Sequence, residues 1–284
     1  MTTTPAAVPG AGAEQPGPYS SPLPTPRPHL GHAVASEWTK LTSVRSTLWT
    51  LGSLVALVVG VGMLAVLQTS ARDYQYLPFT GPALFGLMAG QVAVIVLGVL
   101  TISSEYGTGL IRTTFTAAPE RLRVLTAKYL VFGVVAFAVT TGSVMFVGLW
   151  AALLHNGPAA GQHSWSEWGG ALAGSFYVTL LGVLALAVGA LVRHSAGGIA
   201  VMLGVVTMPP VLGAILSAWP VTSGLGSLVL RFNAPVGLIQ LFGLQGSDLG
   251  GETLPSKLAQ LTLLGLVTAS AVAASYAVVG RRDV

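Results

Sequence analysis

Long apolar stretches alternate with short polar connections along most of the chain. Six of them reach the length of about 20 residues that a helix needs to cross a hydrocarbon layer about 30 Å thick. They cover residues 48–68, 83–102, 129–154, 169–192, 197–219 and 258–279. We therefore expect residues 32–284 to form an all-α integral membrane protein with six transmembrane helices.

The first thirty residues have a different composition. They hold eight of the seventeen prolines, with Thr, Ala, Ser and Gly between them. Such a segment has no apolar core to bury, so we expect residues 1–31 to be a disordered, Pro-rich cytoplasmic tail. No hydrophobic run follows a basic start there, so the pattern does not predict a signal peptide.

An amphipathic helix is expected between this tail and the first span. Its apolar residues recur every three or four positions and are Val34, Trp38, Leu41, Val44 and Leu48. Glu37, Lys40 and Ser43 lie elsewhere around the helix. The pattern favours an interfacial helix that runs into the first span, with Trp38 at the level of the lipid headgroups. The alternative is a simple flank of that span.

The distribution of basic residues orients the predicted spans, because cytoplasmic loops carry an excess of Lys and Arg. With both termini inside, the cytoplasmic residues are Arg27, Lys40, Arg45, Arg112, Arg121, Arg123, Lys128, Arg193, Arg281 and Arg282. Only Arg72, Arg231 and Lys257 then lie outside. Ten basic residues against three favour this orientation.

The segment from Pro220 to Lys257 allows two interpretations. Its apolar run GLGSLVLRFNAPVGLIQLFGL is long enough for a seventh crossing. That crossing would bury Arg231 and move the last basic residues outside. We instead expect two short, re-entrant-type helices that approach the membrane from outside and are interrupted near Asn233–Pro235.

The overall composition supports a membrane protein. Hydrophobic residues make up 52% and charged residues 8% of the chain, compared with roughly 25% charged residues in soluble domains. The net charge of +4 could indicate a nucleic-acid ligand. However, the basic residues lie at the ends of apolar runs and do not form an aromatic-containing patch, so we expect anionic lipid and no nucleic acid as their partner.

The loop from Ser103 to Lys128 is the best candidate for a docking surface. Tyr106, Leu110 or Ile111, Phe115 and Ala118 would share one face of a helix, and Pro119 would end that helix. A short helix along the membrane followed by a turn and a span is suited to transmitting a push from a soluble partner. The alternative is a solvated connector with an ordinary cluster of basic residues.

Two stretches of the chain support a docking surface by their resemblance to a known protein family. The stretch SEWTKLTSVRSTLWTL and the loop SSEYGTGLIRTTFTAAPERLRVLTAKYL resemble the corresponding regions of type-2 ABC transporter permeases. These are the six-span membrane subunits of bacterial ABC exporters. The resemblance covers the whole expected membrane domain, and it implies a multi-pass protein of the bacterial plasma membrane. The Pro-rich tail departs from the family pattern.

The resemblance also assigns roles to particular residues. Val34–Thr47 resembles the family's connecting helix, whose residues would include Trp38, Lys40, Leu41 and Arg45. The stretch from Glu105 to about Ala118 resembles the coupling helix that docks into the ATPase subunit. Its residues would be Glu105, Tyr106, Gly107, Gly109, Arg112, Thr113 and Phe115. The turn that begins with Arg193 and His194 would form a second, smaller cytoplasmic contact.

Absent motifs indicate that the chain is not itself an enzyme. It has no GxxxxGK[ST] loop to bind nucleotide phosphates, so ATP and Mg are expected on a separate ATPase subunit. It has no HExxH or GxSxG motif and no cysteine, and its five histidines are scattered, so no metal site is expected. The resemblance implies a second permease copy or a paralogue as a further partner.

The predicted spans contain no Asp, Glu, Lys or Arg at depth. Proton-driven transporters usually need such groups, so a secondary transporter is disfavoured. An ATP-driven exporter of a hydrophobic or amphiphilic compound agrees with an apolar interior. The alternative from another class is a non-transporting membrane scaffold or sensor that binds a soluble cytoplasmic partner.

Weakly polar and helix-breaking residues are the remaining features of the spans. Gln91, Thr140 and Thr141 could face a transport pathway, but hydrogen bonds between helices are the favoured interpretation. Pro209 and Pro210 should kink the fifth span, either to open a cavity or as a packing feature. The pairs Gly86–Gly90 and Gly170–Gly174 are spaced for close helix packing.

Overall fold

The structure is a computed structural model that describes residues 29–110, 121–244 and 255–281. These residues form helices and no strands, and six of the helices are long and apolar enough to cross a membrane. The six are α2 (Arg45–Gln68), α3 (Gly81–Thr108), α5 (Arg121–His155), α6 (Trp165–Val192), α7 (Ser195–Ser217) and α10 (Lys257–Arg281). The prediction of an all-α, six-span membrane protein is confirmed.

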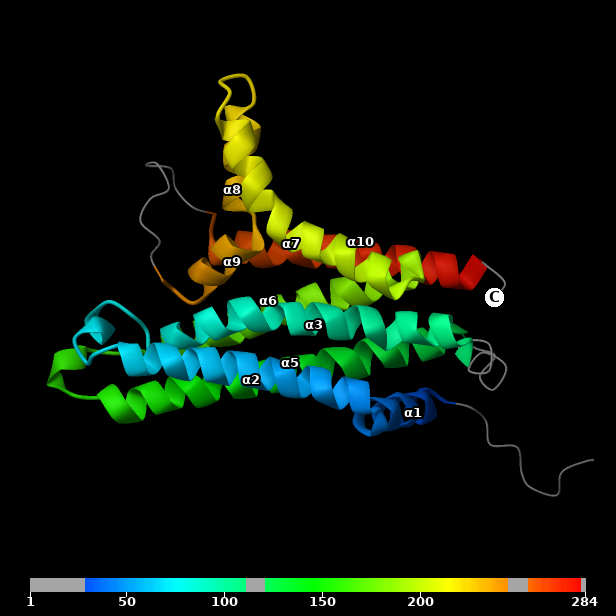
Figure 1. The fold of residues 1–284 in the computed structure, drawn as a ribbon, viewed down its shortest axis with the longest axis horizontal. Helices are drawn as coiled ribbons and strands as arrows, with labels where there is room; N and C mark the ends of the chain where they lie inside the picture. The colour runs from blue at the N-terminus through cyan, green and yellow to red at the C-terminus, as the bar shows by residue number, and fades with distance from the viewer. Residues whose placement is uncertain (1–28, 111–120, 245–254, 282–284) are drawn as a thin grey trace, which may run out of the picture.

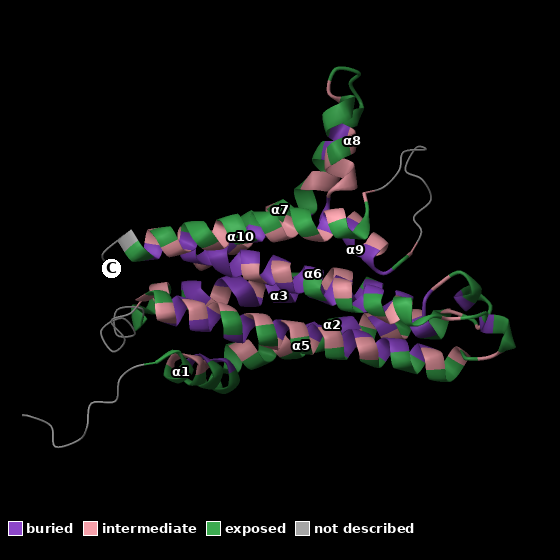
Figure 2. Ribbon diagram, turned by 180° about the vertical axis from the view of Figure 1, so that it is seen from behind, coloured by how far each residue is buried: buried purple, intermediate pink, exposed green. Residues whose placement is uncertain are grey.

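The long helices run roughly along one axis, with α3 and α6 in the middle of the bundle (Figures 1 and 2). About 67% of the apolar window of each of these two helices is buried, compared with 17–39% for the other four. The outer helices keep exposed leucines and valines, which suit contact with lipid because lipid tails are as apolar as these side chains. The chain is a multi-pass membrane protein with a two-helix core.

Glycines allow the central helices to approach their neighbours closely. A Cβ atom on Gly86 would lie only 2.3 Å from the carbonyl oxygen of Val58 in α2, and one on Gly90 would lie 2.6 Å from the Val58 side chain. On α6, Gly170 and Gly174 face Leu241 and Phe242 in the same way. The two predicted glycine pairs therefore lie at packing contacts.

The N-terminal helix differs in its limits from the prediction. Helix α1 covers Leu30–Ser43, so helical structure begins earlier than residue 32, while most of the predicted disordered tail lies outside the described residues. Val44 has extended backbone angles (φ −80°, ψ 119°) and separates α1 from α2. Residues 45–47, including Arg45, belong to α2 and not to a connecting helix that extends to Thr47, because this break ends α1 first.

The loop between the second and third spans is shorter than predicted. Helix α3 continues six residues beyond the apolar stretch that ends at residue 102 and stops at Thr108, where Gly109 adopts a left-handed conformation (φ +73°). Glu105, Tyr106 and Gly107 therefore form the last turn of α3, which corrects the expected start of a separate helix at Glu105. The predicted coupling residues Arg112, Thr113 and Phe115 lie outside the described residues.

The segment before the last span forms two short helices, α8 (Ser223–Arg231) and α9 (Ala234–Leu241). Asn233 separates them, and its side chain accepts a hydrogen bond from the backbone N–H of Val236 at the start of α9. Neither helix is long enough to cross a membrane, so the predicted pair of short helices is confirmed and the alternative of a seventh crossing is not met. Two short 3₁₀ helices, η1 (Asp73–Gln75) and η2 (Pro158–Ala160), lie in other connections.

Pro209 and Pro210 lie inside α7. Toward its C-terminal end, α7 bends away from the bundle and forms a projecting hairpin with α8 (Figure 1). This bend agrees with a kink in the fifth span. Helix α1, the 193–194 turn and the end of α10 all lie at the opposite end of the long axis from η1 and η2. We call this the α1 end of the bundle.

Candidate functional site

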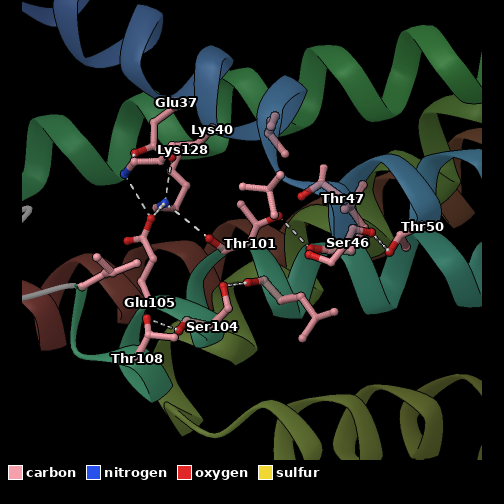
Figure 3. Close-up of a pocket in the computed structure, with 15 residues that line it drawn as sticks. Glu37, Lys40, Ser46, Thr47, Thr50, Thr101, Ser104, Glu105, Thr108 and Lys128 are labelled. Atoms are coloured by element: carbon pink, nitrogen blue, oxygen red, sulfur yellow. Dashed lines mark hydrogen bonds and ion pairs between the residues drawn. The ribbon is translucent and has the colours of Figure 1, made fainter.

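Four charged side chains meet where α1, α3 and α5 converge, and we call them the charged cluster: Glu37, Lys40, Glu105 and Lys128. The Nζ atom of Lys128 lies 2.7 Å from Oε2 of Glu37 and 2.8 Å from Oε1 of Glu105. The Nζ atom of Lys40 lies 2.7 Å from Oε1 of Glu37 and 3.1 Å from Oε1 of Glu105. Each lysine bridges both glutamates, so the cluster links α1 and α5 to the last turn of α3 (Figure 3).

Three of the four side chains are buried. Lys128 is 2%, Glu37 3% and Glu105 7% exposed, whereas Lys40 is only half-buried. Buried charges cost free energy unless they are paired and hydrogen-bonded. Here two acidic and two basic groups balance each other. The cluster therefore holds three helices in one relative position, and removal of one member would leave a buried charge without its partner.

The carboxylates of Glu37 and Glu105 stabilise the charged form of Lys40. Burial lowers the pKa of Lys40, but hydrogen bonds and charge interactions with Glu37 and then Glu105 outweigh this effect and raise the pKa above its ordinary value. Lys40 is therefore a cation at neutral pH. It is the member of the cluster that water reaches most easily, with 37% of its side chain exposed.

The second predicted contact lies next to the same end of α3. Arg193 ends α6 in a left-handed conformation (φ 57°), and its guanidinium carbon lies 5.1 Å from the centre of the Tyr106 ring. Ser103 donates a hydrogen bond of 3.0 Å to Ser195 at the start of α7. His194 caps α7, because its Nδ1 accepts from the backbone N–H of Gly197. The end of α3 is thus linked to the turn between α6 and α7.

Arg193 retains unused hydrogen-bonding capacity. Its Nε and Nη2 atoms are buried and have no hydrogen-bond partner among the residues that the structure describes. A guanidinium has five N–H donors and pairs well with carboxylates. Because both atoms are buried, an acidic group would reach them only if the turn moved.

The predicted connecting helix packs against the bundle with a different face from the one that the apolar pattern predicts. Glu37 and Leu41 are buried against the bundle, whereas Trp38 is 52% exposed. The buried face therefore contains an acidic residue that the pattern had placed on the polar side. Trp38 is exposed, and its position at the lipid headgroups stays a prediction.

The residues suggested for a pathway lie apart from the charged cluster. Gln91 is buried and donates to the backbone carbonyl of Met88, and Thr140 donates to that of Ala136. The hydroxyl of Thr141 is buried without a partner among the described residues. Gln91 and Thr140 thus donate within their own helices and not between helices, and Oε1 of Gln91 is buried without a partner among the described residues. Their place along a pathway stays a prediction.

Sequence reasoning missed the roles of Glu37 and Lys128. Lys128 was grouped with ordinary basic flanking residues, and Glu37 lies 91 positions away from it. A usable signal existed, since Glu37 and Glu105 are acidic residues within stretches where basic residues dominate. Such an exception indicates a specific partner.

Within residues 29–110, 121–244 and 255–281, no group of three or more His, Cys, Asp or Glu side chains could hold a metal ion. Comparison with known proteins adds no assignment, because neither a protein-family model nor a curated protein matches the chain.

Proposed function

We propose that the chain is the membrane permease subunit of an ATP-driven ABC exporter of a hydrophobic or amphiphilic compound. In this proposal, the α1 end and both termini face the cytoplasm of a bacterial cell, across the plasma membrane. ATP and Mg bind to a separate ATPase subunit, and a second permease copy or a paralogue completes the transporter. This chain then carries out no chemical reaction itself.

The convergence of three segments at the α1 end is the observation that carries the proposal. By the resemblance, the Glu105–Tyr106 turn and Arg193 belong to the two contacts with the ATPase, and α1 belongs to the connecting helix. Although these segments are far apart in the sequence, the charged cluster and the Tyr106–Arg193 contact bring them together.

This arrangement supports a mechanical role. A displacement of the end of α3 would move α1 and α5 through the ion pairs, and α6 and α7 through Arg193 and Ser195. Together with α3 itself, five helices would then respond to one contact at the α1 end. A rigid link of this kind is what a permease needs to couple ATP hydrolysis to helix movement.

Arg193→Glu should weaken binding of the ATPase. The substitution replaces a cation that has free donors by an anion, and loss of one charge-assisted contact corresponds to about 1.5–3 kcal/mol, or tenfold or more in affinity. The tagged chain is purified from native membranes in a mild detergent, and co-purifying proteins are identified by mass spectrometry. We expect a nucleotide-binding ATPase with the wild type and at least about tenfold less of it with the variant.

Lys257→Glu, at the start of α10 and far from the α1 end, is the matched control and should retain the ATPase. Equal recovery of the ATPase with Arg193→Glu and with Lys257→Glu would refute the assigned contact. Absence of any ATPase from the wild-type preparation would instead favour the non-transporting scaffold.

A further inference from the structure

A cavity of about 490 Å³ lies between α1, α2 and α3, next to the charged cluster. This volume is within the range of small-molecule sites. Figure 3 shows the four charged side chains at one end and Ser46, Thr47 and Thr50 at the other. Its apolar lining consists of Leu41, Val44, Leu97, Leu100 and Leu110. The cavity thus has a charged end and a largely aliphatic wall, which suits an amphiphile.

The charged end has one unused acceptor and one unused donor. Lys128 directs its three N–H groups to Glu37, Glu105 and the carbonyl of Thr101, whereas Lys40 has two acceptors among the residues that the structure describes. Glu37 accepts on both oxygens, but Oε2 of Glu105 is buried and has no partner among the described residues. A buried carboxylate oxygen without a hydrogen bond costs free energy, so it favours a ligand that donates one.

Four of the hydroxyl groups along the cavity act as acceptors toward a ligand. Thr50, Thr101, Ser104 and Thr108 each donate a hydrogen bond of 2.6–2.8 Å to a backbone carbonyl of their own helix. Their hydrogens are therefore occupied, and only lone pairs remain. These four hydroxyl groups favour N–H donors over a purely anionic head group, whereas Ser46 and Thr47 also line the cavity and keep hydroxyl hydrogens that can donate.

We propose that the cavity binds a membrane lipid with a primary ammonium head group, of the phosphatidylethanolamine class. Its ammonium would donate to Oε2 of Glu105, and its phosphate would accept the third N–H of Lys40. Because the cluster already contains two positive and two negative groups, a zwitterionic head leaves the site neutral. Exposed apolar side chains on α2 place the cavity beside the surface that suits contact with lipid. The site does not depend on an ATPase.

Native mass spectrometry of the purified full chain in detergent tests the proposal. Lysophosphatidylethanolamine, lysophosphatidylcholine and lysophosphatidylglycerol with the same acyl chain are added at equal concentration. The choline head lacks N–H donors and the glycerol head lacks the cation. We expect one bound lysophosphatidylethanolamine, with at least about tenfold higher affinity than the other two lipids.

Thr50→Phe should fill the cavity and lower this binding at least about tenfold, without altering the charged residues. Thr39→Phe, on the exposed side of α1 and outside the cavity, should bind like the wild type. Glu105→Gln, where it folds by circular dichroism, should abolish the preference for ethanolamine over choline. Equal binding of the three lipids, or wild-type binding by Thr50→Phe, would overturn the proposal, and neither result bears on the ATPase.

Discussion

Lys128→Met should destabilise the protein by about 3–5 kcal/mol, because it leaves two buried carboxylates with one partly exposed lysine between them. Methionine retains most of the side-chain volume, so the effect reports the lost charge and not a cavity. Thermal unfolding of the purified chain in detergent, followed by circular dichroism, measures the change. The variant should unfold well below the wild-type temperature.

Two further variants distinguish the loss of ion pairs from a general disruption of the fold. Lys40→Met should lower the free energy of unfolding less than Lys128→Met does, because Lys128 still bridges both glutamates and Lys40 is partly exposed. Combining Lys128→Met with Glu37→Gln and Glu105→Gln should recover part of the loss, because no buried charge then lacks a partner. An unfolding temperature equal to wild type for Lys128→Met alone would show that the ion pairs do not hold the helices together.

Gly86→Ala should also be strongly destabilising. The added Cβ would lie 2.3 Å from the carbonyl oxygen and 2.8 Å from the Cα atom of Val58, and backbone atoms cannot move aside without separating α2 from α3. Overpacking of this kind costs about 1–3 kcal/mol or more. The same unfolding experiment measures the cost.

Gly142→Ala in α5 is the control for the change in helix propensity. Nothing lies within 4 Å of the Cβ position there, so alanine should stabilise the helix by up to about 1 kcal/mol. Similar unfolding temperatures for the two variants would mean that α2 and α3 are not in such close contact.

The apolar pattern predicts the spans well and their ends poorly. Hydrophobicity marks the part of a helix that lies in lipid, whereas a helix continues into water as long as its backbone bonds and capping allow. Thus α3 extends to Thr108, where Gly109 adopts positive φ, and the described part of α5 already includes Arg121, ahead of the predicted span. The break at Val44 shows the converse, since the periodicity continues through a residue that is not helical.

The exceptional acidic residues Glu37 and Glu105 indicate a specific partner, but the pairing within the charged cluster could not be predicted from composition or spacing alone. Its members come from three helices, and their pairing depends on how α1 folds back against α5. The residues that the resemblance assigns to connecting and coupling segments, Lys40 and Glu105, nevertheless belong to the cluster. Their partners Glu37 and Lys128 are apparent only when the helices are placed in space.

Site-specific photo-crosslinking in cells tests the central proposal, that an ATPase docks at the α1 end. A photoreactive amino acid is placed at His194, in the exposed turn beside Arg193, and in a second variant at Val221, which is 96% exposed and lies beyond the end of α7. The proposal predicts a crosslinked ATPase from position 194 and none from position 221. Crosslinking of an ATPase from position 221, or from neither position, would contradict it.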